Sequence, residues 1–144
     1  MDNSWKYPPV VIEDALAIDD EKSICIQAKE YYSRLALKVN AGELYEFKVD
    51  KSDRWIDLII PSKASGFRNF FAGKKKLRVP QVGCFYLCGT IEMDDTNNFP
   101  IGLGRKFEIP VSGKIHFFAN DKKDSRFANI NNWGCIQLKI RRLA

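Results

Sequence analysis

The feature of this sequence that most constrains its fold is an alternation of apolar and polar residues that begins near residue 34. Residues 35–39 place apolar side chains at every second position, and residues 45–49 repeat the rhythm. Successive side chains of a β-strand point to opposite faces of a sheet, so this period predicts strands with one face in a core and one in water. The turn sequence Asn40-Ala-Gly42 between the two stretches predicts a β-hairpin.

Further short strands follow, each bounded by turn residues or proline. We expect them at residues 55–60, 84–91, 105–109, 114–119 and 136–141. Residues 21–32 fit both helical and strand spacing, and we favour a strand there. A series of short strands without alternating helices predicts an all-β fold, either a sandwich or a barrel.

Two regions depart from the rhythm. Residues 62–78 predict a long loop, a length that is more often functional than structural. Residues 1–20 predict a separate N-terminal arm, which leaves residues 21–144 as one domain. A chain of 144 residues has the usual size for a single hydrophobic core.

Composition narrows the protein class further. The apolar runs at residues 55–60 and 84–88 are far shorter than the roughly 20 residues that span a bilayer, so we expect no membrane insertion. The first residues carry an acid and two prolines where a secretory signal needs a basic start and an apolar run. We therefore expect a cytoplasmic protein or one exported without such a signal. The four cysteines form no CxxC pair and predict reduced, buried thiols, at Cys25, Cys84, Cys88 and Cys135.

Nothing in the sequence indicates catalysis. The single histidine, His116, lies between two apolar strand residues and is expected to be a partly exposed strand residue rather than a general base. No GxSxG, HExxH, phosphate-loop or dinucleotide-binding pattern is present. We predict a binding protein and not an enzyme.

The densest set of polar side chains lies in the loop at residues 120–134. Oxygen-bearing side chains within this loop are Asn120, Asp121, Asp124, Ser125, Asn129, Asn131 and Asn132. Calcium takes six to eight hard oxygen ligands and accepts amides and main-chain carbonyls beside carboxylates, so this loop predicts a calcium site. The alternative is that these residues stabilise turns through Asx hydrogen bonds. Lys122, Lys123 and Arg126 would repel a cation unless they point outward.

The order of these features resembles the LecA-type galactose-specific, calcium-dependent bacterial lectins. The matching stretches are the Ala41-Gly42 turn with residues 43–49, the break before Trp55, residues 88–91, the strand before Pro110, and residues 113–121 and 131–140. The most specific part of the resemblance is an order of elements along the chain, in which a strand is followed by Asn-Asp, a loop, Asn-Asn-x-Gly and a final strand. The resemblance implies an antiparallel, jelly-roll-like, two-sheet β-sandwich that binds a galactose-like sugar.

The resemblance also implies the ligands of the site. Calcium would be held by the side chains of Asp121, Asn131 and Asn132 and by main-chain oxygens of Trp55 and of Asp124 or Ser125. Hydroxyl groups of the sugar would complete the shell, and Phe127 or Trp133 would pack on the apolar face of the sugar. This sequence departs from the family in a longer, basic loop and in residues 67–78, which lack the family's sugar-contacting His and Gln.

The net charge of +5 and the pI near 9.0 keep a second class of function open. Short basic segments could bind nucleic acid or another anionic ligand, with an affinity that falls steeply as salt rises. A third reading is a protein-interaction domain, or a homo-oligomer, within a larger assembly. The basic residues that carry the second reading are Lys74, Lys75, Lys76, Arg78, Arg126, Lys139, Arg141 and Arg142.

Overall fold

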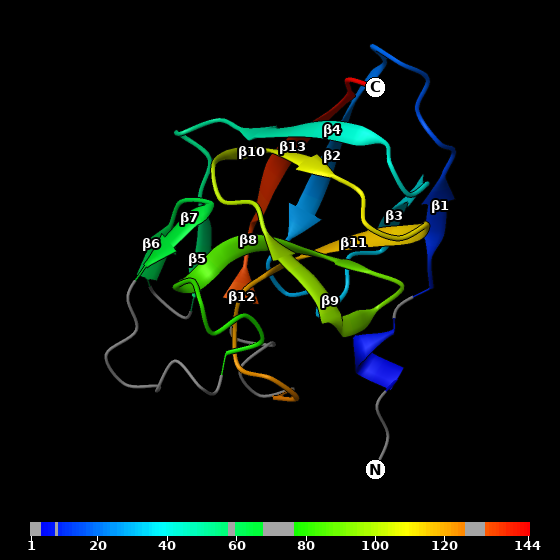
Figure 1. Cartoon of the computed structure of the whole chain (residues 1–144). Coiled ribbons are helices and arrows are strands. Elements are labelled where there is room, and N and C mark those ends of the chain that lie inside the picture. Colours follow the sequence, from blue (N-terminus) through cyan, green and yellow to red (C-terminus); the bar gives the residue numbers. More distant parts are fainter. Residues whose placement is uncertain (1–3, 8, 58–59, 68–76, 126–131) are drawn as a thin grey trace.

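The computed structural model describes residues 4–7, 9–57, 60–67, 77–125 and 132–144. These residues form a β-sandwich (Figure 1). One sheet has six strands: β1 (Val11–Glu13), β3 (Leu35–Val39), β11 (Gly113–Ala119), β8 (Cys84–Ile91) and β7 (Ser65–Phe67) in that order, with β9 (Asp94–Pro100) also paired to β8. The second has the order β10 (Gly104–Glu108), β4 (Leu44–Val49), β13 (Cys135–Arg142) and β2 (Glu21–Gln27). A small third sheet has the order β12 (Asn132–Trp133), β5 (Trp55–Asp57) and β6 (Ile60–Ser62).

The two larger sheets share one core. Phe47 on β4 lies 5.9 Å from Phe117 on β11 and 6.1 Å from Phe99 on β9, measured between ring centroids. The apolar side chains of β13 predicted to share a face are all buried, whereas the intervening polar ones are exposed. The predicted all-β sandwich is therefore confirmed, and its sheets are antiparallel except for the parallel β1–β3 pair.

The hairpin predicted from residues 35–49 is wrong. β3 pairs with β1 and β11 in the six-stranded sheet, whereas β4 pairs with β10 and β13 in the other. The turn at Asn40-Ala-Gly42 carries the chain from one sheet to the other, and Gly42 adopts the left-handed φ of +89° that this turn requires. Alternation determines which face of a strand is buried, but both sheets bury their faces in the same core, so it does not determine the partner strand.

Other boundaries differ as well. The strand expected at residues 55–60 is a hairpin in which Trp55 pairs with Ser62, and Pro61 is tolerated because β6 is an edge strand. The predicted loop contains β7, while its residues 68–76 lie outside the described residues. The strand favoured near residues 21–32 is β2, and the predicted arm contains β1. β9 was not predicted because its sequence, DDTNNFP, is mostly polar.

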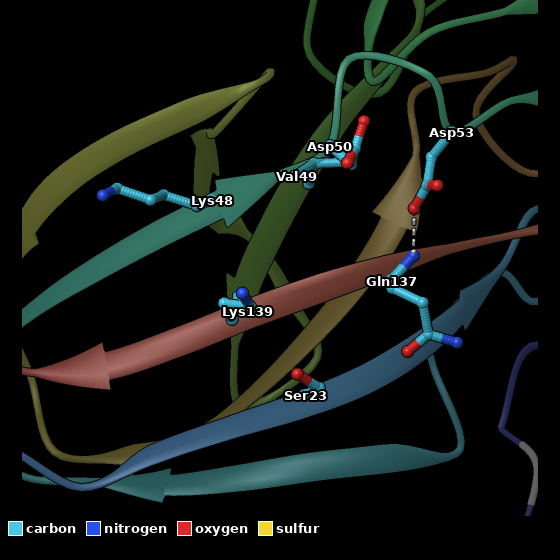
Figure 2. A pocket seen from close by; sticks show the side chains of 7 residues that line it. All are labelled: Ser23, Lys48, Val49, Asp50, Asp53, Gln137 and Lys139. Atoms are coloured by element: carbon cyan, nitrogen blue, oxygen red, sulfur yellow. Dashed lines mark hydrogen bonds between the residues drawn. The ribbon is translucent and has the colours of Figure 1, made fainter.

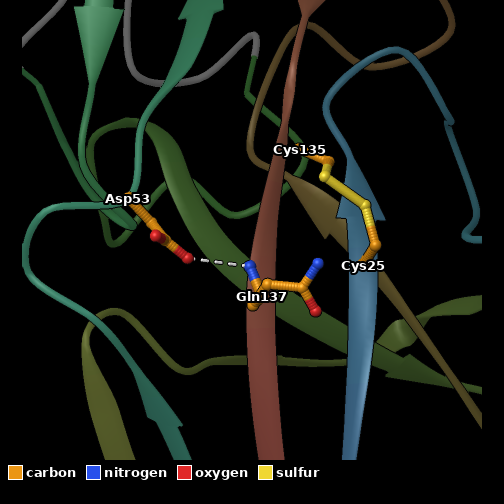
Figure 3. The surroundings of a disulfide bond; sticks show 4 residues. All are labelled: Cys25, Asp53, Cys135 and Gln137. Atoms are coloured by element: carbon orange, nitrogen blue, oxygen red, sulfur yellow. Dashed lines mark hydrogen bonds between the residues drawn. A yellow bond between two sulfur atoms is a disulfide. The ribbon is translucent and has the colours of Figure 1, made fainter.

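Two of the four cysteines form a disulfide, which corrects the expectation of reduced thiols at these positions. Cys25 on β2 is bonded to Cys135 on β13, and Figure 3 shows the bond crossing between the two strands. Cys25 lies opposite Gln137 and Cys135 opposite Gln27, so the bond runs diagonally, with Cα atoms 5.8 Å apart. The other two cysteines, Cys84 and Cys88, are buried and form no disulfide, as predicted.

The outer face of the six-stranded sheet is covered by a second cluster. Val79, Cys88 and Phe118 are buried there, and His116 on β11 is only 1% exposed. The expectation of a partly exposed histidine is therefore wrong, because an alternating strand can be covered on both faces. His116 Nδ1 lies 2.7 Å from the carbonyl oxygen of Ser33, and burial lowers the pKa of the imidazole.

The described residues contain one helix, the 3-10 turn η1 (Ser4–Lys6). None of the helical structure in these ranges is long and apolar enough to cross a membrane.

The buried histidine predicts a loss of stability in mild acid. Below about pH 6.5 the unfolded chain takes up a proton at His116, whereas the folded state, with its lowered pKa, resists protonation, so the free energy of unfolding falls as pH decreases. The melting temperature should drop between about pH 7.5 and about pH 5.5, above the range where carboxylates titrate. His116→Gln should flatten this slope, because the chain has one histidine. An unchanged slope in the variant would contradict the assignment.

Candidate functional site

Two of the side chains predicted to bind calcium lie in contact. Asp121 is the second residue after the end of β11, and Asn132 is the first residue of β12. Both side chains therefore lie where a long loop leaves and rejoins the sheets. Asn132 Nδ2 donates a hydrogen bond of 3.0 Å to Asp121 Oδ2. Both residues are buried, with 8% of Asp121 and 2% of Asn132 exposed. The fold therefore brings a carboxylate and an amide together across the loop.

The side-chain amide of Asn132 has hydrogen-bond partners for its nitrogen but not, among the described residues, for its oxygen. Its Nδ2 also donates to the carbonyl oxygen of Ala28 at 3.2 Å. Its Oδ1 is buried and has no hydrogen-bond partner among the described residues. A buried polar atom left unpaired costs about 1–3 kcal/mol, so this oxygen favours a donor or a cation as its partner.

These side chains fit a calcium ion in chemical type. A carboxylate and an amide oxygen are both hard oxygen donors, and calcium combines the two in irregular loops. Asp121 Oδ1 accepts a hydrogen bond of 2.7 Å from the main-chain N–H of Lys122, which orients the carboxylate. No cluster of three or more His, Cys, Asp or Glu side chains able to hold a metal occurs in the described ranges. Any metal held here would thus depend on amide and main-chain oxygens.

The third sheet places the predicted main-chain ligand, Trp55, on the strand that pairs with β12. β12 pairs with β5, with Asn132 opposite Asp57 and Trp133 opposite Ile56. Trp55 begins β5 and is fully buried, with its indole N–H donating to the carbonyl oxygen of Phe85 at 3.2 Å. Trp55 therefore lies on the strand next to Asn132.

The remaining loop ligands have other surroundings. The carboxylate of Asp124 is exposed and forms an ion pair with Lys6 of η1, which lowers the pKa of that carboxyl. Asp124 also has a left-handed φ of +58°, and its N–H donates to the Tyr31 hydroxyl at 3.3 Å. Ser125 is half-buried. Asn131 and Phe127 lie outside the described residues.

Trp133 stands on the other side of β12 from Asn132. Neighbouring strand residues point to opposite faces, and Trp133 is 62% exposed whereas Asn132 is buried. Its cross-strand partner Ile56 is also exposed. The structure therefore does not bring Trp133 together with the Asp121–Asn132 pair.

The predicted basic patch is divided. Arg78 is buried, which corrects its assignment to an exposed patch: its guanidinium carbon lies 3.6 Å from the ring centroid of Tyr31 and 3.5 Å from that of Phe118. Arg141 pairs with Asp19, and Arg142 pairs with Glu43. Four further residues of the predicted patch lie outside the described residues, namely Lys74, Lys75, Lys76 and Arg126.

Sequence reasoning did not identify the separate role of Asn120. This side chain is fully buried and holds the chain between Val79 and Gly83 against the end of β11. Its Oδ1 accepts from the N–H of Val79 at 2.9 Å, and its Nδ2 lies within 2.9 to 3.3 Å of the carbonyl oxygens of Val79, Val82 and Gly83. Nothing in the composition of the loop separates this structural asparagine from the others.

Comparison with solved structures shows the fold. The structure is similar to the N-terminal domain of EclA, described as a PllA-like lectin, with a TM-score of 0.58 and 15% identity over 83% of this chain and 94% of that one. It also matches PliG from Aeromonas hydrophila, a periplasmic inhibitor of g-type lysozyme, with a TM-score of 0.39 and 9% identity over 91% and 96% of the two chains. No protein-family model and no curated protein sequence matches the chain. The first similarity shows that this chain has a lectin-like fold.

Asn120 generates a stability prediction. Asn120→Ala should lower the free energy of unfolding by about 3 kcal/mol, because it leaves several buried main-chain groups without partners. Denaturant unfolding followed by circular dichroism measures the change. The control is Asn40→Ala, which removes the same group from an exposed turn and should cost less than about 0.5 kcal/mol. Equal effects in the two variants would contradict the role of Asn120.

Proposed function

We propose that this domain is a carbohydrate-binding module that holds a galactose-like sugar through a calcium ion at Asp121 and Asn132. The observation that carries the proposal is the contact between these two side chains beside an amide oxygen that has no hydrogen-bond partner among the residues that the structure describes. The similarity in fold to a domain described as a lectin supports the same class of function.

The chemistry of the proposed site follows from its ligands. When bound, calcium would offer coordination positions to adjacent hydroxyl groups of a sugar. Asp121 would supply the negative charge, and Asn132 would turn its amide oxygen toward the ion. Asn131 is proposed as a second amide ligand, with main-chain oxygens from Trp55 and from Asp124 or Ser125, and Phe127 as a ring against the sugar. Burial of the pair strengthens its electrostatic attraction for a cation, because charges interact more strongly where water is excluded.

The disulfide supports one of the two locations expected from the sequence. Disulfides persist in oxidising compartments and are rare in the cytosol. The bond between Cys25 and Cys135 therefore favours export over residence in the cytoplasm.

Calcium titration tests the metal site. Calcium should raise the stability of the folded domain, by about 2.7 kcal/mol when it is present at a hundred times its dissociation constant, and EDTA should reverse the effect. Asp121→Asn should abolish the stabilisation, since it removes the charge while keeping the shape. The control is Asp20→Asn, which removes the same charge from an exposed residue next to the other end of β13.

Isothermal titration with galactose then tests the function. Galactose should bind in calcium, and binding should disappear in EDTA and in Asp121→Asn while it persists in Asp20→Asn. A domain that is stabilised by calcium but binds no sugar would reject the carbohydrate reading and keep the metal site. A domain that does not respond to calcium, or whose response survives Asp121→Asn, would reject both.

A further inference from the structure

A second polar site lies on the outer face of the four-stranded sheet. An open groove of about 450 Å³ is lined there by residues from β2, β4, β13 and the turn after β4 (Figure 2). None of its lining residues belongs to the candidate calcium site. The residues that line it are Ser23, Lys48, Val49, Asp50, Asp53, Gln137 and Lys139.

The charges beside the groove are arranged in rows across the strands. In one row Lys106 on β10 lies opposite Glu46 on β4, Glu46 opposite Arg141 on β13, and Arg141 opposite Glu21 on β2. Signs alternate along this row, and cross-strand pairs of opposite charge stabilise a sheet. This row needs no external ion.

The next row breaks that pattern at the groove. Lys48 lies directly opposite Lys139, which in turn lies opposite Ser23. Like charges directly across a strand pair are destabilising. Lys48 Nζ is 3.4 Å from Glu46 Oε1, and Figure 2 shows its side chain extended away from Asp50 and Asp53. Lys139 forms no ion pair within the part of the chain that the structure describes, so an anionic group between the two lysines would remove a repulsion.

The other end of the groove presents carboxylates. Asp50 Oδ1 accepts hydrogen bonds from the N–H and the hydroxyl of Ser52, at 2.8 and 2.7 Å, which lower the pKa of that carboxyl and leave Oδ2 for another donor. Asp53 Oδ2 accepts from the main-chain N–H of Gln137 at 2.9 Å, as Figure 2 shows, which leaves its Oδ1. These acceptors favour hydroxyl groups and repel a ligand that is anionic along its whole length.

We propose that this groove binds an acidic sugar. The carboxylate of a hexuronate would lie between Lys48 and Lys139, and its ring hydroxyls would donate to Asp50 and Asp53, with the exposed amide of Gln137 beside them. Lys48 and Asp50 are two positions apart along the chain, about 6.8 Å in an extended strand, which suits a pyranose that carries its charge at one end. The site uses no metal, so it is independent of the proposed calcium-dependent function.

The test uses the full chain in EDTA and low salt, with sodium galacturonate as the probe and galactose as its neutral counterpart. Amide chemical shifts should move for residues of the groove with galacturonate and not with galactose. Lys139→Gln should weaken galacturonate binding about tenfold, the loss expected for one charge-assisted hydrogen bond. The matched control, Lys106→Gln, removes the same charge from the same sheet, in the row that is already neutralised, and should leave the affinity unchanged. Because Lys139→Gln relieves a repulsion, its melting temperature should not fall.

Several results would overturn the proposal. One is equal binding of galacturonate and galactose, and another is an equal effect of the two lysine variants. A third is that acetate shifts the amide signals of the groove as much as galacturonate does, which would indicate a general attraction of anions. Asp121→Asn separates the two proposals, since it should leave galacturonate binding in EDTA intact. Galacturonate binding without any response to calcium would thus reject the calcium site alone. A response to calcium without galacturonate binding would reject the groove alone.

Discussion

The packing of two sheets against one shared core is the constraint on which the rest of this structure depends. Phe47 from one sheet meets Phe117 and Phe99 from the other, and the chain crosses between the sheets at the turn that ends in Gly42. Because both sheets bury their inner faces in this core, function is left to the outer faces and to the loops at the ends of the strands. The two outer faces differ. That of the six-stranded sheet is covered by a second cluster, whereas that of the four-stranded sheet is open to water.

The sequence predicts which face of a strand is buried better than it predicts which strands pair with each other. Alternation identifies the buried side of β4 and β13 correctly, because the period of a strand is a local property. It fails at the turn between β3 and β4, where strands that are adjacent in the chain join different sheets. It fails at His116 because a second layer covers that face. The Cys25–Cys135 bond, across a sequence separation of 110, depends on the register of β2 against β13, which no local pattern contains.

The contact between two residues of the candidate site was expected for a different reason. The resemblance to the lectin family, which is carried by Asn-Asp after one strand and Asn-Asn-x-Gly before another, implies that the two ends of the loop return to neighbouring positions. Asp121 and Asn132 do lie in contact. The same pattern does not separate ligand from scaffold. Both polar atoms of the Asn120 side chain form hydrogen bonds with the main chain of residues 79–83. Trp133 lies on the opposite side of its strand from Asn132. Asn and Asp serve in turns, clamps and metal sites alike, so only the partner atoms decide between these roles.

The two polar sites also differ in how the fold prepares them. Asp121 and Asn132 are buried, so little water competes for the carboxylate and for the amide oxygen, which has no partner within the described ranges. In the proposed calcium site, this burial would favour one compact cation over diffuse charge. The groove is exposed, and screening there limits what each lysine contributes, so discrimination has to come from the placement of charges at both ends. The sheet supplies that placement. β13 is hydrogen-bonded on both sides, and the disulfide ties it to β2 (Figure 3). This pairing fixes Lys139 and Gln137 relative to Ser23. A shallow site on a rigid surface can thus be selective where the same residues on a loop would not be.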